Sequence, residues 1–583
     1  MLLSTTPERG TSLLMIEGSL TVIVIALAFC CPNLGSRPFR YIEKLFSQLA
    51  RKKNLAVATI GLSALLLRLA MLPLCPIPHP FTPNDFSFLL AANTFASGRL
   101  TNPTPAMWIH FESIHITMKP TYMSMYFPAQ GLVLAAGKVL AGNAWYGVLF
   151  TTALMCSAIC WMLQAWLPPT WALLGGMLAV LRLGLFSYWI NTYSGGGSIA
   201  ALGGALVLGA FPRFMKTVSA RHGLLLAVGA ILLATTRPYE GLLLCIPVGI
   251  VLLRWVLLGH NKPSTVLLLR HTAVPVMLLL VAGLWMAYYD YRAFGNPFIP
   301  PYAINRATYA VAPYYIWQSQ RPAPAYRHSV MRDFYYENEL AAAQKMNSFT
   351  GFISQTIIKF FRSILFFSGI ALLPPLVMIG RVLTDRRMRF LVLSVFILMG
   401  GMISEIFLVP HYLAPFTAAF YAIGLQSMRH LRLWSTGGQP VGLGLVRAIV
   451  ALCFVLTGLR LCATPLHLKL VESPASAWTD EWYGPGQFGK ERADIQASLD
   501  RLPGTQLIFV RYSKPHNLMN EWVYNEPDIN HAKVIWAREM NPSENLELIK
   551  YYKDRKTWLA QPDLNPVKLE PYSVSLSEAG ISN

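Results

Sequence analysis

The chain has 583 residues, of which 54% are hydrophobic and only 13% are charged. A soluble protein carries about 25% charged residues, so this composition excludes an ordinary soluble domain and indicates a membrane protein. The net charge of +20 is distributed over short loops between apolar runs, which argues against a nucleic-acid-binding face and favours a role in membrane topology.

A membrane span needs roughly 17 to 25 mostly apolar residues. The sequence contains twelve such segments and therefore predicts a mainly α, polytopic helical membrane protein. The segments are 13–31, 54–76, 145–165, 169–190, 197–213, 222–237, 239–257, 271–289, 353–380, 389–409, 411–428 and 446–463. The shorter apolar run 128–141 is expected to lie at the membrane interface or to re-enter.

The basic residues give these spans an orientation. With twelve spans counted, five loops rich in Lys and Arg all fall on one side, and such loops face the cytoplasm. The other side then receives two long polar loops, 77–144 and 290–352, and everything after Ala463. Loops of this length in a compact membrane domain usually bind or catalyse.

The predicted organisation has three parts: an N-terminal span with a basic cytoplasmic segment (1–53), a transmembrane domain (54–463) and a small extracytoplasmic α/β domain (464–583). In the last part helices and strands alternate. The expected order is helix 490–501, strand 505–512, helix 516–524, strand 532–538, helix 543–554 and strand 556–560. This part lacks the glycine-rich and nucleophile motifs of α/β enzymes, which favours a structural or acceptor-docking role.

Near its start, the first long loop contains Pro83, Asn84 and Asp85, ahead of apolar residues at helical spacing that end at Gly98. This is a helix-start signal. We therefore predict a short amphipathic helix at the outer interface, with Asp85 in its first turn. On residue type alone, Asp85 is expected to cap this helix.

Titratable side chains follow in the same loop, in the stretch HFESIH. On a strand His110 and Glu112 would share one face, and His115 would point the other way. Because this spacing is not the HExxH pattern of zinc proteases, a metal site is a weak alternative to a solvated loop.

Arg237 lies at the outer end of one predicted span, and Glu240 lies at the start of the next. A planar guanidinium makes two charge-assisted hydrogen bonds to phosphate, which suits a lipid carrier. Anchoring to lipid headgroups explains the arginine equally well. The turn NTYSGGGS (191–198) on the same side offers small, flexible backbone, suited to the close approach of a ligand or to a tight turn.

The second long loop, 290–352, is rich in tyrosine, tryptophan and arginine. Aromatic planes stack on sugar rings, and arginine and tyrosine side chains hydrogen-bond hydroxyl groups, so carbohydrate is a natural ligand. Anchoring at the membrane interface explains many of the rings equally well.

These features support a family resemblance. Residues 80–140, PFTPNDFSFLLAANTFASGRLTNPTPAMWIHFESIH with the following KPTYMSMYFPAQGL, resemble the first external loop of bacterial GT-C-type membrane glycosyltransferases. These are the relatives of the protein O-mannosyltransferases and the lipid A aminoarabinose transferase. The layout of 54–463 is also similar. The resemblance implies a GT-C-like fold and transfer of a sugar from a polyprenyl-phosphate donor to an acceptor, usually with inversion.

In that family the first external loop carries a pair of acids followed by a helix. The matching place here is Asn84-Asp85, where the first acid is an amide, which cannot accept a proton at neutral pH. The resemblance therefore implies three alternatives: Asp85 is the general base, Glu112 or His110 serves instead, or the chain no longer catalyses.

The resemblance also implies that Lys119 and Arg237 bind the donor phosphate, since Lys119-Pro120 and Arg237 match basic positions of the family. No metal ligand is assigned, and the only cofactor left open is a divalent cation. The further residues expected to contact substrate are Asn84, Tyr193, Tyr239, Glu240, Arg292 and His411.

The resulting hypothesis is a glycosyltransferase of the bacterial inner (cytoplasmic) membrane, with its active site and C-terminal domain on the extracytoplasmic side. Its expected partners are a polyprenyl-phosphate sugar donor, a glycan, lipid or protein acceptor and the lipid bilayer, but not nucleic acid. One alternative is a non-catalytic binding or assembly subunit, for which Asn84 is the best support. Another is a lipid-linked glycan transporter, which predicts ionisable groups near the midplane instead of polar groups pooled at one face.

Overall fold

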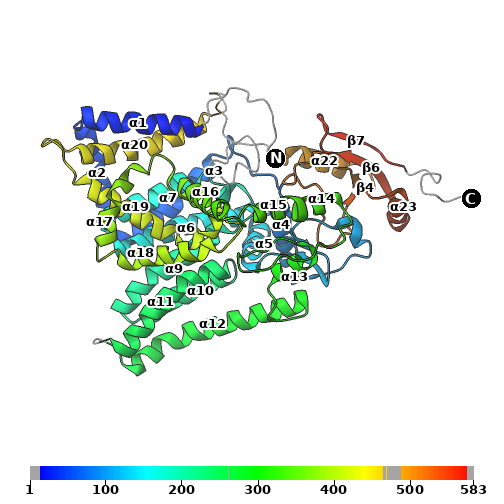
Figure 1. Cartoon of the computed structure of the whole chain (residues 1–583), viewed down its shortest axis with the longest axis horizontal. Coiled ribbons are helices and arrows are strands. Elements are labelled where there is room, and N and C mark those ends of the chain that lie inside the picture. The colour runs from blue at the N-terminus through cyan, green and yellow to red at the C-terminus, as the bar shows by residue number, and fades with distance from the viewer. Residues whose placement is uncertain (1–12, 260–261, 464–465, 467, 469–487, 574–583) are drawn as a thin grey trace, which may run out of the picture.

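The computed structural model describes residues 13–259, 262–463, 466, 468 and 488–573. Figure 1 shows a bundle of helices at one end of the molecule and a small sheet at the other. Among the described residues, seven helices are long and apolar enough to cross a membrane. They are α1 (Leu13–Cys30), α3 (Lys53–Ala70), α6 (Trp145–Trp166), α9 (Gly197–Lys216), α11 (Pro238–Leu258), α12 (Thr265–Phe294) and α20 (Val441–Leu461).

The other five predicted spans also form helices, but these are shorter or interrupted. They are α7 (Pro169–Ala179) with η2 (Val180–Gly184) and α8 (Tyr188–Asn191), α10 (Ala220–Ala234), α16 (Phe349–Ser368) with η4 (Pro374–Met378) and α17 (Ile379–Thr384), α18 (Arg389–Ile403), and η5 (Pro410–Tyr412) and η6 (Ala414–Phe416) with α19 (Thr417–Arg432). Segment 353–380, for example, is broken because Gly369 has a φ of 58° and Pro374 begins a new turn. Helix length and apolar composition together therefore support seven spans among the described residues, and the count of twelve stays a prediction.

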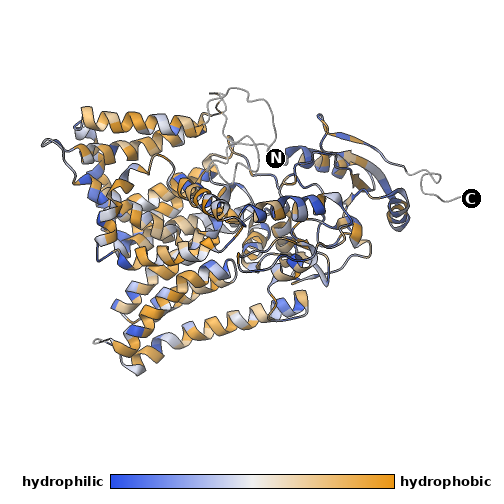
Figure 2. Ribbon diagram, in the orientation of Figure 1, coloured by the Kyte–Doolittle hydropathy of each residue, from blue (hydrophilic) through white to orange (hydrophobic). Residues whose placement is uncertain are grey.

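The seven helices differ in how far the protein covers them. Helices α6 and α9 are largely buried, whereas α12 is exposed along most of its length. Figure 2 shows apolar residues over α12 and throughout the bundle. An exposed apolar helix is stable only against lipid, so α12 lies at the periphery of a multi-pass membrane protein.

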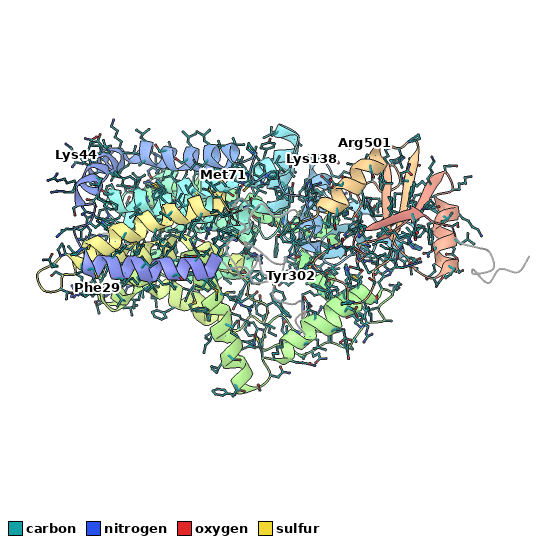
Figure 3. The ribbon with its side chains drawn as sticks, turned by 90° about the horizontal axis from the view of Figure 1, so that it is seen from above. Phe29, Lys44, Met71, Lys138, Tyr302 and Arg501 are labelled. Carbon is teal, nitrogen blue, oxygen red and sulfur yellow. The ribbon has the colours of Figure 1, made fainter. Side chains whose placement is uncertain are left out.

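The basic segment after α1 forms the helix α2 (Ser36–Arg51). Figure 3 shows Lys44, on this helix, at the end of the bundle opposite to Arg501 of the C-terminal part. The strongly basic segment and the polar loops thus lie at opposite ends of the bundle, as the two-sided charge distribution predicts.

The first long loop folds around α4 (Pro83–Ala96). It also contains η1 (Trp108–Phe111), a three-stranded antiparallel sheet of order β1-β3-β2 (Asn102–Pro103, Thr121–Ser124, Ile116–Thr117) and α5 (Pro128–Ala141). Most residues of α4 are buried, so the expected amphipathic helix at the interface is wrong. The reason is tertiary cover: α5 packs on one side, and Tyr524 of the C-terminal part stacks on Phe86 at a centroid distance of 4.8 Å.

The second long loop contains four short helices: α13 (Pro301–Tyr309), α14 (Ser329–Arg332), η3 (Asp333–Asn338) and α15 (Glu339–Gln344). They follow the C-terminal end of α12 (Figure 1). Asn305 on α13 donates a hydrogen bond to the carbonyl of Ile116 at 3.1 Å, so the two long loops pack against each other above the bundle.

The C-terminal part forms a four-stranded sheet of order β5-β4-β6-β7, in which β4 pairs in parallel with β5 and β6, and β7 is antiparallel to β6. The predicted helix 516–524 is wrong, because its amide groups find other partners: Glu521 Oε1 accepts from Trp522 and Val523, and the Glu521 amide binds Phe81. The elements are α22 (Lys490–Arg501), β4 (Thr505–Val510), β5 (Val534–Arg538), α23 (Pro542–Tyr551), β6 (Arg555–Gln561) and β7 (Lys568–Pro571).

The carboxyl edge of this sheet is fastened to the first long loop. Arg538, at the end of β5, donates to Glu521 Oε2 at 2.7 Å and to the carbonyl of Glu112. Ser113 of the loop donates to the same Glu521 oxygen at 3.1 Å. Because Arg538 and Glu521 are both buried, removing either would strand a buried charge. These contacts thus fix the position of the first long loop, which contains α4, relative to the sheet.

Candidate active site

A cavity of about 400 Å³ lies between the bundle and the long loops. Small-molecule sites typically measure roughly 300 to 1,000 Å³, so this volume suits a ligand of several rings. Figure 3 places Tyr302, one of the lining residues, between the bundle and the C-terminal part. The walls come from α4, η3, α15, the start of α11 and segment 405–412, most of which the predicted topology assigns to the outer face.

Three carboxylates line the cavity, and two of them are paired. Both oxygens of Glu339 lie 3.3 Å from Arg306 Nη1, and Glu240 lies 4.0 Å from Arg237. Glu405 is 2% exposed, and its Oε2 has no hydrogen-bond partner among the described residues. Of these three acids, Glu405 therefore has an oxygen available to a ligand.

The surroundings of Glu405 disfavour its charge. Burial raises the pKa of this carboxyl well above its usual range, and the neighbouring Glu240 raises it further, whereas Arg237 and Lys359 oppose the shift. Lys359 also donates to the backbone carbonyl of Glu405 at 2.9 Å, which fixes the segment. A carboxylate with a raised pKa, facing a cavity, is suited to accept a proton from a substrate.

Arg237 supplies the positive charge of the site. Its Nη2 donates to the carbonyl of Gly195 at 3.1 Å, and its guanidinium carbon lies 4.3 Å from the centre of the Tyr412 ring. Gly195 has a φ of 87°, and a Cβ there would lie 3.0 Å from His411 Nδ1. Only glycine lets this turn approach so closely, which gives the predicted glycine-rich turn a place in the cavity wall.

Neutral polar groups complete the wall near α4. Tyr126 Oη donates to Asn84 Oδ1 at 2.7 Å, and His115 Nδ1 lies 3.2 Å from the same hydroxyl. Burial, followed by the charge of Arg306, lowers the pKa of His115 to about 3, so its ring is neutral. Asn84 is therefore part of a hydrogen-bonding group that can contact hydroxyls but carries no charge.

Four of the six predicted substrate residues line the cavity: Asn84, Tyr239, Glu240 and His411. His411 Nδ1 lies 2.8 Å from Tyr188 Oη, and burial holds the pKa of His411 well below its usual range. His411 is thus a neutral ring fixed by Tyr188.

The remaining two substrate predictions lie elsewhere. Tyr193 is buried below the cavity, where its hydroxyl donates to the carbonyl of Pro78 at 3.0 Å and its amide binds Asp85. Arg292 is exposed at the end of α12 and contacts Tyr288 at 2.9 Å. Neither side chain lines the cavity, whereas Tyr302 and Tyr314 of the aromatic loop do.

Asp85 does not line the cavity. Its Oδ2 accepts from the amides of Phe81 and Thr82 at 3.4 and 3.3 Å, and its Oδ1 accepts from the amide of Tyr193 at 3.0 Å. Thr82 accepts from the Asp85 amide in return, which completes a capping box at the start of α4. Both oxygens are thus engaged inside the protein, and the geometry supports the capping role instead of the base.

Replacing Asp85 by alanine should therefore lower stability rather than block chemistry. The change strands three buried amides, each costing roughly 1 to 3 kcal/mol, and removes a helix cap. We expect a clear fall in the thermal unfolding temperature of the purified protein, whereas Asp494→Ala, at an exposed ion pair, should leave it unchanged. A folded, equally stable Asp85→Asn variant that had lost turnover would restore Asp85 as the base.

Lys119, Glu112 and His110 also lie outside the main cavity. Lys119 and Glu112 line a second, smaller cavity, described below. His110 Nδ1 lies 3.5 Å from the Arg538 carbonyl, at the junction with the C-terminal sheet, and burial lowers its pKa to about 4. Lys119 and Arg237 therefore line different cavities. This disagrees with the prediction that both residues bind one phosphate.

Sequence reasoning missed Glu405, Glu339 and Arg306. Glu405 lies within the segment 389–409 that hydropathy assigns to a span, so it was hidden as part of an apolar run. The sequence did contain one signal for Glu405. It is an acid six residues before His411, near the predicted outer end of a span, where an ionisable side chain is costly unless it has a function. Glu339 and Arg306 lie in a loop whose many charged residues gave no basis for choosing among them.

No protein-family model and no curated protein matches the sequence. The resemblance found in residues 80–140 appears again at the level of structure, with membrane glycosyltransferases of the GT-C kind. ArnT from Cupriavidus metallidurans in the apo state has 13% identity and a TM-score of 0.48, over 87% of this chain and 92% of that chain.

Two further structures resemble the chain. The archaeal oligosaccharyltransferase AglB from Archaeoglobus fulgidus, in complex with an inhibitory peptide and a dolichol-phosphate, has 10% identity and a TM-score of 0.39, over 87% of this chain and 69% of that chain. The arabinofuranosyltransferase AftD from Mycobacteria has 13% identity and a TM-score of 0.37, over 87% of this chain and 36% of that chain. At such values the resemblance carries no argument about the reaction, which has to come from the cavity itself.

Proposed function

We propose that the chain is a membrane glycosyltransferase that moves a sugar from a polyprenyl-phosphate donor to an acceptor hydroxyl or amine, with inversion, on the extracytoplasmic side of a bacterial inner membrane. The observation that carries the proposal is the unpaired, buried Glu405 oxygen in a cavity that also holds Arg237. Such a displacement requires a group that accepts the acceptor's proton and a cation that stabilises the leaving phosphate. This cavity contains both.

In the proposed step, the acceptor O–H or N–H attacks the anomeric carbon of the donor while the bond from that carbon to the phosphate oxygen breaks. Glu405 takes the acceptor proton, and the polyprenyl phosphate leaves with the electron pair of the broken bond. Arg237 stabilises the charge of the leaving phosphate. Because a single displacement occurs from the face opposite to the phosphate, the anomeric configuration inverts.

The roles divide among the acids because of their partners. Glu339 is neutralised by Arg306 at 3.3 Å, so it serves to hold the wall. Glu240 orients Arg237 at 4.0 Å, leaving guanidinium N–H groups free to turn toward a phosphate. This leaves Glu405 as the acid that accepts the proton of the acceptor.

A separate apolar groove suits the lipid chain of the donor. It has a volume of about 320 Å³ and lies among α16, α17, α18 and α19. Tyr412 lines the polar cavity and the next residue, Leu413, lines the groove, so the linings of the two spaces are adjacent in the chain at this point. A phosphate beside Arg237 could thus extend its isoprenoid chain directly into the groove.

Filling the groove should weaken binding of a long-chain donor. Gly424 lines it, and a Cβ at this position would meet nothing within 4 Å, so Gly424→Phe introduces a ring from an open backbone position in the groove wall. We expect the KM for a polyprenyl-phosphate sugar to rise about 10-fold, equivalent to displacing two methylenes at about 0.8 kcal/mol each, and the KM for a chain-truncated donor to stay constant. Transfer assays at varied donor concentration measure both.

The matched control is Gly458→Phe on α20, where a Cβ also meets nothing within 4 Å but the residue does not line the groove. It should leave both KM values at the wild-type level. Equal effects of the two substitutions, or an equal effect on long and short donors, would contradict the placement of the lipid chain.

A further inference from the structure

A second cavity, of about 180 Å³, lies on the outer side between the two long loops. Its aromatic walls are Trp108, Tyr309 and Tyr326, and its charged groups are Lys119, Arg327 and Glu112. It shares no lining residue with the main cavity. Its volume is below the roughly 300 Å³ at which small-molecule sites begin, so it is large enough for one ring and not for a chain.

Two cations lie close to the Trp108 ring. Lys119 Nζ lies 4.3 Å and the Arg327 guanidinium carbon 4.7 Å from the centre of a Trp108 ring. Lys119 is exposed, and the Arg327 side chain is 47% exposed. An indole that holds two cations beside an open cavity offers both a stacking surface and positive charge to a ligand.

A buried carboxylate forms the inner wall. Glu112 is 2% exposed, and its Oε1 accepts from Tyr309 at 2.9 Å and lies 3.7 Å from Arg327. His328 Nε2 lies 3.5 Å from Oε2. This acid repels a bare phosphate that penetrates the cavity, but accepts hydrogen bonds from hydroxyl groups.

We propose that this second cavity binds a sugar ring that carries a carboxylate, with the ring stacked on Trp108, hydroxyls directed to Glu112 and the carboxylate between Lys119 and Arg327. The combination of aromatic platform, buried acceptor and exposed cations matches an acidic sugar better than a neutral sugar or an inorganic anion. This assignment accounts for Lys119, which the main cavity does not use.

The position of the cavity indicates which substrate carries this sugar. Tyr309 stacks on Tyr335 at a centroid distance of 5.7 Å, and the Tyr335 hydroxyl accepts from the amide of His115, which lines the main cavity. One pair of tyrosines therefore separates the two spaces. The second cavity then holds an acidic residue of the acceptor glycan. The assignment of this sugar to the acceptor rests on the proposed function, whereas the proposed binding of an acidic sugar does not.

The test is a calorimetric titration of the detergent-solubilised full chain with three probes: a glucuronate-terminated oligosaccharide, its glucose-terminated counterpart and inorganic phosphate. The acidic sugar should bind, and the neutral one should bind about 10-fold more weakly, as expected for one lost charge contact of about 1.4 kcal/mol. Trp108→Ala and Lys119→Glu should each weaken binding of the acidic sugar by about 10-fold or more.

The controls are Phe298→Ala, an exposed aromatic of the same long loop, and Lys553→Glu, an exposed lysine of the C-terminal part. Both should bind like the wild type. Because Lys119 is exposed, Lys119→Glu tests the site even if Trp108→Ala fails to fold. The proposal is overturned if the acidic sugar does not bind, if both site variants bind it normally, or if phosphate or the neutral sugar binds equally well. The titration requires no turnover, so its failure is distinguishable from failure of the transferase assay.

Discussion

Glu405→Gln should lower the rate of sugar transfer by roughly 100- to 10,000-fold, the range that a positioned general base contributes, while the protein stays folded. Glutamine keeps the shape of the side chain but cannot accept the acceptor proton. The measurement is a transfer assay under saturating donor, together with the thermal unfolding temperature of each purified variant.

The pH dependence gives the same prediction a second readout. Burial, and then Glu240, raise the pKa of Glu405, and only the deprotonated form can act as a base. The value of kcat/KM should therefore fall as the pH decreases through a pKa well above that of an ordinary glutamate. This acidic limb should be absent from the residual activity of Glu405→Gln, and Glu240→Gln should move it to lower pH by removing the neighbouring negative charge.

A suitable control for Glu405 is Glu337→Gln. Glu337 lies in η3, is 53% exposed and pairs with Arg332 outside the cavity, so its substitution should change neither rate nor pH profile. If Glu405→Gln kept more than about a tenth of the wild-type rate, far above the expected loss, Glu405 would not be the base.

Arg237→Ala should lower kcat by about 100- to 1,000-fold, as the loss of one group that stabilises developing charge does elsewhere, and should also weaken binding of polyprenyl phosphate. Arg237→Lys should retain part of the activity that Arg237→Ala loses, because lysine keeps the positive charge but cannot form the bidentate hydrogen bonds of arginine. Rates and the affinity for polyprenyl phosphate should be measured on the same preparations.

One complication is that Arg237→Ala leaves Glu240 buried without its partner, which itself destabilises the fold. The double variant Arg237→Ala with Glu240→Gln removes the stranded charge, so it should regain thermal stability without regaining activity. Arg321→Ala, at an exposed arginine of the long loop, is the matched single control. Recovery of transfer in the double variant would show that Arg237 acts on stability and not on the donor.

Much of the site could be predicted from sequence because hydropathy and the positive loops decide which segments meet. Arg237, Glu240, Tyr239, Asn84 and His411 come from three distant segments, and each was expected at the outer face where the cavity lies. The helix starting at Pro83 was also expected, because its start signal is local: proline followed by Asn and Asp.

The remaining part depends on contacts that no local pattern encodes. Asp85 could be a cap or a base on sequence grounds, and the decision comes from the amide of Tyr193, 108 residues away. Glu405 was hidden inside an apolar run, and it matters because its oxygen is unpaired, which only the tertiary structure shows. Lys119 was carried to the donor phosphate by resemblance, yet the fold turns it toward Trp108.

The most direct test of the account is to place wild type and Glu405→Gln in proteoliposomes with a panel of labelled polyprenyl-phosphate sugars and a cell-envelope extract as the source of acceptor. We expect the wild type to release polyprenyl phosphate from one donor in step with incorporation of its sugar, and Glu405→Gln to do neither. Binding of the donors without any release by the wild type would contradict a transferase and favour the non-catalytic binding subunit that Asn84 first suggested.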